Sequence, residues 1–311
     1  MKTNLLILLF TWLTFADVLA NHTILWDANW SADGQYIAVG GNDSILRIYD
    51  GHTLDLLSRD TLKGSIYRLR WHPSDNILAI VGDLDVIQLV NFENKTRVKL
   101  HPTAAGRAIA WNHDGEMIAV ADYEGVLTIW SKQGHLLQKV AKEKSTSYVA
   151  VDWHPCKNEL IALTNDARVY GVSGNLIHQF QHRQEATLQL CVEWHQSGAF
   201  FVIGDYGDYD LNVPPLLQFW NADYQLMQSS DIAQTEYRNL SWSADGQFLA
   251  TANRFLRIWS KEGEMLHETK SAANLWGVDW SPDGLYIVTS DEQHRVKVWN
   301  NKAELVKVLA L

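Results

Sequence analysis

The chain has few of the residues that mark several classes of protein. Cys156 and Cys191 are the only cysteines in 311 residues, which excludes a disulfide-stabilised scaffold and predicts two unpaired core or turn residues. Six prolines and scattered glycines leave no low-complexity linker that would divide the chain. The formal net charge of −10 includes no long run of like charge, so general affinity for nucleic acid or anionic membranes is not expected.

Sequence motifs of catalysis and cofactor binding are also absent. No Gly-x-Ser-x-Gly, His-Glu-x-x-His or phosphate-binding glycine loop occurs. The sequence therefore gives no indication of nucleophilic catalysis, zinc-protease activity or nucleotide binding. We expect neither a cofactor nor an enzymatic activity.

The first twenty residues, "MKTNLLILLFTWLTFADVLA", have the three-part form of a secretory signal peptide. They carry one lysine, an apolar stretch from Leu5 to Phe15 that is short for a bilayer span, and small or β-branched residues at Val18 and Ala20. The pattern predicts cleavage near Ala20 and an exported protein, periplasmic or extracellular, with residues 21–311 as the mature domain. The alternative is a cytoplasmic protein that retains this segment as an N-terminal strand.

A motif of about forty residues recurs seven times in the rest of the chain. Its opening segments read "WSADGQYIAVGG", "WHPSDNILAIVG", "WNHDGEMIAVAD", "WHPCKNELIALTN", "WHQSGAFFVIGD", "WSADGQFLATAN" and "WSPDGLYIVTSD". The lead tryptophans are Trp30, Trp71, Trp111, Trp153, Trp194, Trp242 and Trp280. Each unit continues with an apolar strand, a turn that usually holds aspartate, and a further strand. Seven such units predict an all-β fold, a seven-bladed β-propeller with four antiparallel strands in each blade.

At these residues the chain resembles the WD40-repeat family from about residue 21 to the C-terminus. The segment "WSPDGLYIVTSDEQHRVKVWN" is close to the family pattern. The Trp-Asp pair that ends a family repeat appears only as Tyr49-Asp50, and the Gly-His pair expected nine or ten residues before each lead tryptophan is absent. In the family, that histidine joins a hydrogen-bonded chain with a turn aspartate and a tryptophan. Turn aspartates remain here, among them Asp43, Asp122, Asp166 and Asp291.

The ends of the repeat array predict how the ring closes. The segment "AELVKVLAL" follows Trp299 and can form the outermost strand of blade seven, while "TILWDANW" begins blade one with its innermost strand. All seven blades are then complete without residues 1–20, which favours cleavage of the signal over its retention as a strand.

Metal binding is not expected from the histidines. His72, His154 and His195 each directly follow a lead tryptophan, so they occupy one repeat position in three blades. Equivalent positions form a ring and do not converge on one ion, whereas zinc needs three or four ligands around one point. We interpret them as turn residues with satisfied hydrogen bonds.

Blade five carries an insertion with the sequence "GDYGDYDLNVPP". The interval from the lead tryptophan to the end of the third strand is 26 residues here and 17 to 19 elsewhere, which confines the extra residues to a loop over Gly204–Pro215. Its acidic and aromatic residues are Asp205, Tyr206, Asp208, Tyr209 and Asp210. Their order does not match a calcium loop, and Asp205 aligns with the turn aspartates of other blades. Two interpretations stay open, a plain surface loop and an accessory binding loop.

Two tryptophans are explained neither by the repeat nor by the signal peptide. Trp26 and Trp276 stand four residues before a lead tryptophan, at the start of an innermost strand. The same position around the ring carries Tyr67, Arg107 and Arg238 in neighbouring blades, then Val149 and Leu190. We call the set Trp26, Tyr67, Arg107, Arg238 and Trp276 the top-face arc. In the WD40 family this position opens onto the top face beside the central channel, and Arg, Trp and Tyr are enriched at interaction hot spots.

The sequence therefore predicts a non-enzymatic, monomeric scaffold that binds a protein or peptide through the top-face arc, with the blade-five loop as its rim. One alternative is that the aromatic residues of the arc pack inside the channel mouth as core. The other is an enzyme or small-ligand binder with its site in the central channel. The channel candidates are Asp27, Asp152, Glu193 and Asp279, but three of these share the repeat position directly before a lead tryptophan.

Overall fold

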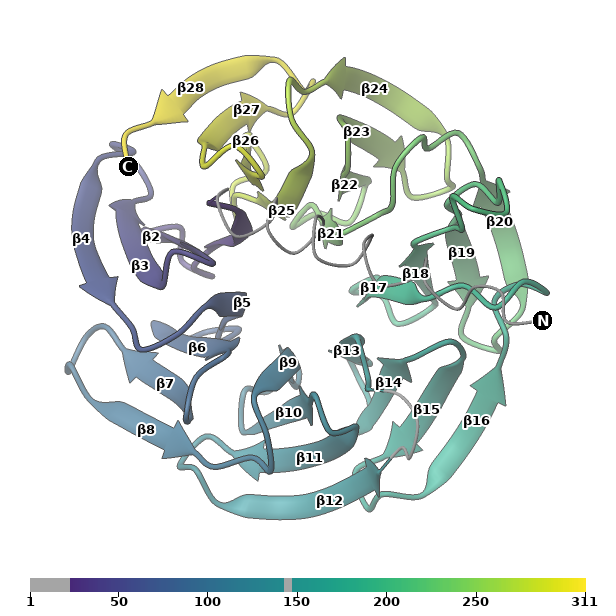
Figure 1. Ribbon diagram of the computed structural model, residues 1–311, viewed down its shortest axis with the longest axis horizontal. Helices are drawn as coiled ribbons and strands as arrows, with labels where there is room; N and C mark the ends of the chain where they lie inside the picture. The colour runs from purple at the N-terminus through teal and green to yellow at the C-terminus, as the bar shows by residue number, and fades with distance from the viewer. Residues whose placement is uncertain (1–22, 143–146) are drawn as a thin grey trace, which may run out of the picture.

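A computed structural model describes residues 23–142 and 147–311, and these form a closed ring of seven four-stranded antiparallel sheets (Figure 1). The predicted signal peptide lies outside the described residues. In each blade the four strands follow one another in sequence order from the centre of the ring to its rim. The predicted seven-bladed all-β propeller is confirmed.

The strands have the following bounds. Blades one and two contain β1 Leu25–Trp30, β2 Tyr36–Gly41, β3 Ile45–Asp50, β4 Leu56–Thr61, β5 Ile66–Trp71, β6 Ile77–Gly82, β7 Ile87–Asn91 and β8 Arg97–Leu100. Blades three and four contain β9 Gly106–Trp111, β10 Met117–Asp122, β11 Val126–Ser131, β12 Leu136–Lys142, β13 Ala150–Trp153, β14 Glu159–Leu163, β15 Ala167–Gly171 and β16 Leu176–Phe180. Blades five and six contain β17 Gln189–Trp194, β18 Phe200–Asp205, β19 Leu217–Asn221, β20 Leu226–Ser230, β21 Asn239–Trp242, β22 Phe248–Ala252, β23 Phe255–Ser260 and β24 Met265–Lys270. Blade seven contains β25 Leu275–Trp280, β26 Tyr286–Asp291, β27 Val296–Asn300 and β28 Leu305–Leu309.

The hydrophobic core lies between the blades. Second strands such as β2, β6 and β10 are mostly apolar and almost completely buried, because a blade packs against each of their two faces. At the junction of blades seven and one, Ile37 and Val39 of β2 share a buried cluster with Val288 of β26 and Val298 of β27. Outermost strands such as β4 are exposed and more polar.

Blade seven is built entirely from β25–β28, as predicted, so the ring closes through side-chain contacts between blades seven and one. The Asp279 carboxylate accepts the backbone N–H of Trp30 at 2.8 Å. The Tyr49 hydroxyl donates to the carbonyl of Ala310 at 3.0 Å. Further out, His294 Nε2 lies 3.0 Å from Asp43 Oδ2. The seam therefore combines this buried apolar cluster with hydrogen bonds at several distances from the centre of the ring.

The histidines that follow lead tryptophans connect neighbouring blades. His72 Nε2 lies 3.0 Å from the carbonyl oxygen of Gly115 in the next blade, and His195 Nε2 lies 2.9 Å from that of Gly246. Both glycines have positive φ, and a Cβ on either would come within 2.4 Å of the facing ring. The interpretation of these histidines as buried turn residues is confirmed, since each is less than a tenth exposed.

Lead tryptophans are tied to the preceding blade in one of two ways. In blades two to four the indole N–H donates to a backbone carbonyl, as Trp71 does to Asn29 at 3.1 Å. In the other blades a side chain accepts the tryptophan's backbone N–H, as Asp152 does from Trp194 at 2.7 Å. In these blades the indole nitrogen of the lead tryptophan is buried and has no hydrogen-bond partner among the described residues. The tryptophans are Trp30, Trp194, Trp242 and Trp280.

The turn aspartates keep their hydrogen-bonding role. Asp122 accepts the backbone N–H groups of Glu124 and Val126, and Asp291 pairs with Lys297 at 2.9 Å. In blade five, His182 Nε2 lies 2.8 Å from Asp205 Oδ2. The Gly-His dipeptide is absent, but His182 makes the same kind of contact to a turn aspartate. His182 stands twelve residues before the lead tryptophan, outside the usual spacing.

Candidate interaction face and central channel

Bulges at the start of the innermost strands aim the arc residues. The register between first and second strands shifts in blades one, two, three, five and seven. The residues that the pairing skips include Trp26, Tyr67, Arg107 and Trp276. A bulge leaves the extra residue outside the ladder and re-aims its side chain, so strand pairing sets the direction of the side chain at this repeat position.

All five arc residues are half-buried, neither core nor fully exposed. Val149 and Leu190 complete the same repeat position in blades four and five, and both are buried at 6% and 5% exposure. The large polar and aromatic side chains are thus confined to one side of the ring, while the other side is closed by aliphatic residues.

One half of the arc joins the blade-five loop. The guanidinium of Arg238 lies 4.0 Å from the ring centre of Trp276 and 5.9 Å from that of Tyr206. Tyr206 packs edge-on against Tyr209, whose hydroxyl donates to Glu236 at 2.6 Å. Glu236 also pairs with Arg238. Cation–π contacts and hydrogen bonds therefore connect this half of the arc to the blade-five loop.

The other half of the arc is joined by a residue that sequence reasoning missed. Trp26 and Tyr67 pack with ring centres 4.8 Å apart, and Tyr67 contacts Tyr123 at 5.6 Å. Arg107 lies over the Tyr123 ring at 5.3 Å and donates a hydrogen bond to Ser147. Tyr123 is 48% exposed. It follows a turn aspartate, as Tyr206 does in blade five, and that shared position is the signal that could have found it.

The blade-five loop is shorter and better anchored than predicted. Gly204 and Asp205 belong to β18, which leaves residues 206–216 as the connection. Asp205 is fully buried and bonded to His182, so it holds the base of the loop and does not belong to its exposed rim. Asp208 accepts the N–H of Leu211 at 3.0 Å, and Asp210 is exposed. Tyr206 and Tyr209 are 36% and 48% exposed, as an accessory contact surface requires.

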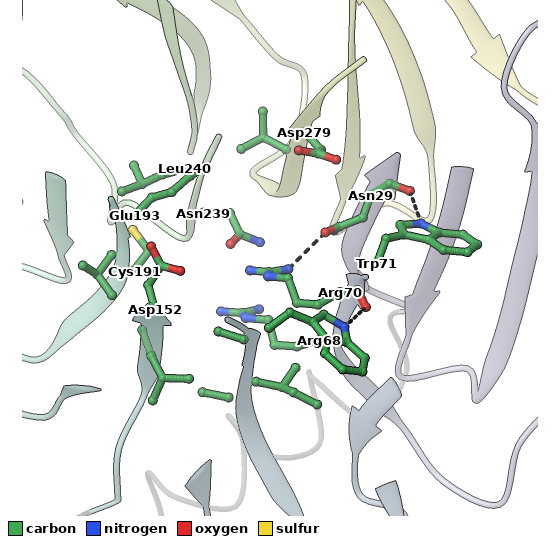
Figure 2. A pocket seen from close by; sticks show the side chains of 18 of the residues that line it. Asn29, Arg68, Arg70, Trp71, Asp152, Cys191, Glu193, Asn239, Leu240 and Asp279 are labelled. Carbon is green, nitrogen blue, oxygen red and sulfur yellow. Dashed lines mark hydrogen bonds between the residues drawn. The ribbon is translucent and has the colours of Figure 1, made fainter. Parts of the chain in front are cut away.

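Below the arc, the innermost strands line a cavity of about 390 Å³ in the central channel (Figure 2). Asp152, Glu193 and Asp279 line it as predicted, and Arg68 and Arg70 of β5 line it as well. Sequence reasoning missed both arginines, although Arg70 occupies the same repeat position as these three acids.

Asp27, the fourth predicted channel acid, is fully buried next to the cavity. It is paired with Arg70, with 2.9 Å between Oδ2 and Nη1. The acids directly before lead tryptophans accept backbone N–H groups of the next blade. These carboxylates are therefore held in place by hydrogen bonds to neighbouring strands.

The environment of the channel acids favours their protonated forms. Burial raises the pKa of Asp152 to about 7 and that of Asp279 to about 6. Burial, with the neighbouring Asp152 and Asp279, also raises the pKa of Glu193 well above its usual value. Burial opposes the charge of Arg70, yet the nearby carboxylates, Asp27 foremost, raise its pKa above the usual value.

Comparison with known proteins supports the repeat assignment. Residues 14–50 and 263–300 match the family model "WD domain, G-beta repeat". Residues 58–169 and 146–278 match the model of "Eukaryotic translation initiation factor eIF2A". Together with the seven four-stranded blades, these matches decide the family. The chain belongs to the WD40-repeat β-propeller family.

Similar WD40 proteins are larger than this chain. "Cell division cycle 20.1, cofactor of APC complex" of Arabidopsis thaliana is 22% identical over 88% of the chain and 53% of that protein. "Periodic tryptophan protein 2 homolog" of Caenorhabditis elegans is 19% identical over 90% of the chain and 32% of that protein. "Intraflagellar transport protein 80 homolog" of Mus musculus is 20% identical over 65% of the chain and 25% of that protein. The chain thus spans from a quarter to about half of these relatives.

WD40 propellers generally act as protein-interaction scaffolds without enzymatic activity. Within residues 23–142 and 147–311, no three His, Cys, Asp or Glu side chains are grouped so that they could hold a metal ion. The same residues contain no helix long and apolar enough to cross a bilayer. Cys156 and Cys191 are unpaired, as predicted.

Proposed function

We propose that this WD40 propeller is a protein-interaction scaffold that holds a protein or peptide segment on its top face. The observation that carries the proposal is the pair of aromatic and arginine clusters beside the channel mouth. One contains Trp276, Arg238 and Tyr206, and the other contains Trp26 and Tyr67.

The residue chemistry supports this choice of face. Half-buried Trp, Tyr and Arg side chains offer apolar area that is already ordered, so little side-chain entropy is lost when a partner covers them. Arg238 and Arg107 at the two ends of the arc favour a partner segment that combines apolar side chains with carboxylates. The exposed Tyr206 and Tyr209 serve as the rim that excludes water around such a segment.

The test combines identification of a partner with a measured affinity. A partner is co-purified from the native host, and its dissociation constant is then measured for the wild type and for Trp26→Ala with Trp276→Ala. We expect the double variant to weaken binding by at least about 2 kcal/mol, roughly thirtyfold. Because both tryptophans are half-buried, each truncation is expected to cost about 2 kcal/mol of folding stability, half of a fully buried aromatic residue.

Tyr286→Ala is the matched control. Tyr286 begins β26 at the opposite end of blade seven from Trp276 and is 37% exposed. It should fold and bind as the wild type does. A folded double variant that retains the wild-type affinity for every native partner would refute the use of the arc.

A further inference from the structure

The channel contains an arginine that forms no salt bridge with any described residue. Arg68 lines the cavity, and its one hydrogen bond runs from Nη1 to the carbonyl of Tyr67 at 3.2 Å. A guanidinium has five N–H donors, so most of its capacity is unused. Burial lowers the pKa of Arg68, the negative charge of Asp27 opposes this shift, and the like charges of Arg70 and Arg238 act in the same direction as burial. A partly desolvated cation between two other cations is costly unless an anion joins it.

The nearest acid is already occupied by other donors. Asp27 Oδ2 accepts from Arg70 Nη1 and from the backbone N–H of Leu69, both at 2.9 Å. Asp27 Oδ1 accepts from Asn29 at 2.8 Å and from Asn239 at 3.3 Å. These bonds hold the Asp27 carboxylate on Arg70 and leave Arg68 facing the cavity.

A carboxylate oxygen of Glu193, in the same cavity, lacks a hydrogen-bond partner. Glu193 Oε1 accepts the backbone N–H of Trp242 at 3.2 Å, whereas its Oε2 is buried and bonds to nothing in the described part of the chain. No ion pair joins Glu193 to Arg68 or Arg70 among the described residues. Figure 2 shows both guanidinium groups extending from β5 toward the side of the opening that carries Cys191 and Glu193.

The space between these groups is suited to a small molecule. A cavity of about 390 Å³ falls in the lower part of the range of ligand pockets. The small residues Ala108, Ala110 and Ala150 form part of its wall in blades three and four, beside larger residues such as Ile109 and Trp111. A ligand that satisfies both Arg68 and Glu193 must carry an anionic group and a donor cation on one compact frame.

We propose that the central channel binds a small zwitterion, a free amino acid or dipeptide, with its carboxylate on Arg68 and its ammonium group on the carboxylate of Glu193. The bound ammonium stabilises the ionised form of Glu193, and the bound carboxylate offsets the charge of Arg68. The site goes beyond the top-face function and does not depend on it, because the arc residues are not part of its contact set.

The first test uses the wild-type chain alone. The twenty free amino acids and Ala-Ala are titrated at pH 7 by isothermal titration calorimetry. Each ligand that binds is compared with its C-terminal amide, which lacks the carboxylate, and with its N-acetyl form, which lacks the ammonium. We expect either change to weaken binding at least tenfold, because each removes a charge-assisted contact. This comparison needs no variant, so it stands even if a substitution impairs folding.

The second test assigns the two ends of the ligand. In Arg68→Gln, the free ligand and its amide should bind equally weakly, while acetylation still lowers affinity. In Glu193→Gln, acetylation should no longer matter, while amidation still does. The matched control is Arg59→Gln on the exposed face of β4, which should bind as the wild type does. Arg68→Gln should also have a thermal midpoint at least as high as that of the wild type, since it removes a costly charge and a single hydrogen bond among the described residues.

Three results would overturn the proposal. The first is that no ligand of the panel binds at 10 mM, which is on the order of the weakest specific affinities. The second is equal binding of free and N-acetylated ligands, which would indicate a simple anion site. The third is unchanged binding in both variants. Each leaves the top-face experiment unaffected, because that experiment measures a protein partner and different residues.

Discussion

The stability of the folded protein should depend on pH through Asp152, and Asp152→Asn isolates that dependence. Asp152 lies one residue before Trp153, the last residue of β13, and its Oδ2 accepts the backbone N–H of Trp194 at 2.7 Å. Asparagine keeps an acceptor oxygen at this place and removes only the titration. The variant is therefore expected to fold with the inter-blade contact preserved.

The size of the effect follows from the pKa of the folded state. Burial raises the pKa of Asp152 from 3.8 to about 7, so the folded protein binds a proton that the unfolded chain releases between about pH 4 and 7. The stabilisation is fully present below about pH 4 and is lost as the pH rises through about 7. About three units correspond to about 4 kcal/mol as an upper limit, and water in the channel reduces this to roughly 2–4 kcal/mol.

The assay is chemical denaturation of the wild type and of Asp152→Asn from pH 4 to pH 8.5. The free energy of unfolding of the variant minus that of the wild type should be small at pH 4 and reach about 2–4 kcal/mol in favour of the variant above pH 7.5. His72 and His154, whose pKa burial lowers, oppose this trend as the pH falls below about 6.5. Both proteins contain them, so they cancel in the difference.

Asp85→Asn is the control, because Asp85 is exposed and its carboxylate stays in water. Its difference from the wild type should not change with pH. A difference for Asp152→Asn that is constant across the range, or that grows toward acid, would refute the argument that burial holds this carboxyl protonated.

Two further predictions concern the cysteines and the N-terminus. Cys191 is 4% exposed and burial raises its pKa to about 12, whereas Cys156 is exposed. Ellman's reagent should therefore titrate one thiol in the native protein and two in guanidinium chloride. Rapid native reaction of both thiols would contradict the buried position of Cys191. Native protein should begin at Asn21 on N-terminal sequencing, since Leu5–Phe15 followed by Ala20 has the form of a cleaved signal. A mature chain that begins at Met1 or Lys2 would exclude export by this route.

The parts of the fold that repeat were predictable from the sequence. Trp30 and its six equivalents fix the register of each blade, so the four-strand order, the closing strand Leu305–Leu309 and the turn position of His72 all follow from counting. The repeat gives seven separate observations of each shared feature, so an irregular sequence in one unit does not change the assignment of strands in the others.

The features that escaped prediction depend on contacts between units. Asp27 lies 43 residues from Arg70 and far from Asn239 in sequence, yet the ring brings all three together. The bulge at Trp276 is a property of strand pairing, which the repeat alone does not reveal. His182 was missed because its spacing to the lead tryptophan departs from the family norm.

The closure of the ring has a mechanical consequence. Because no described strand is shared between blades seven and one, their junction has the same kind of packing and hydrogen bonds as those between the other blades. Tension applied between β1 and β28 would load that junction in shear across contacts such as the one from Tyr49 to Ala310, while every blade stayed internally hydrogen-bonded. The propeller would then open as a chain of intact blades, and a circular permutant cut between any other two blades would move this weak point without changing a single strand pair.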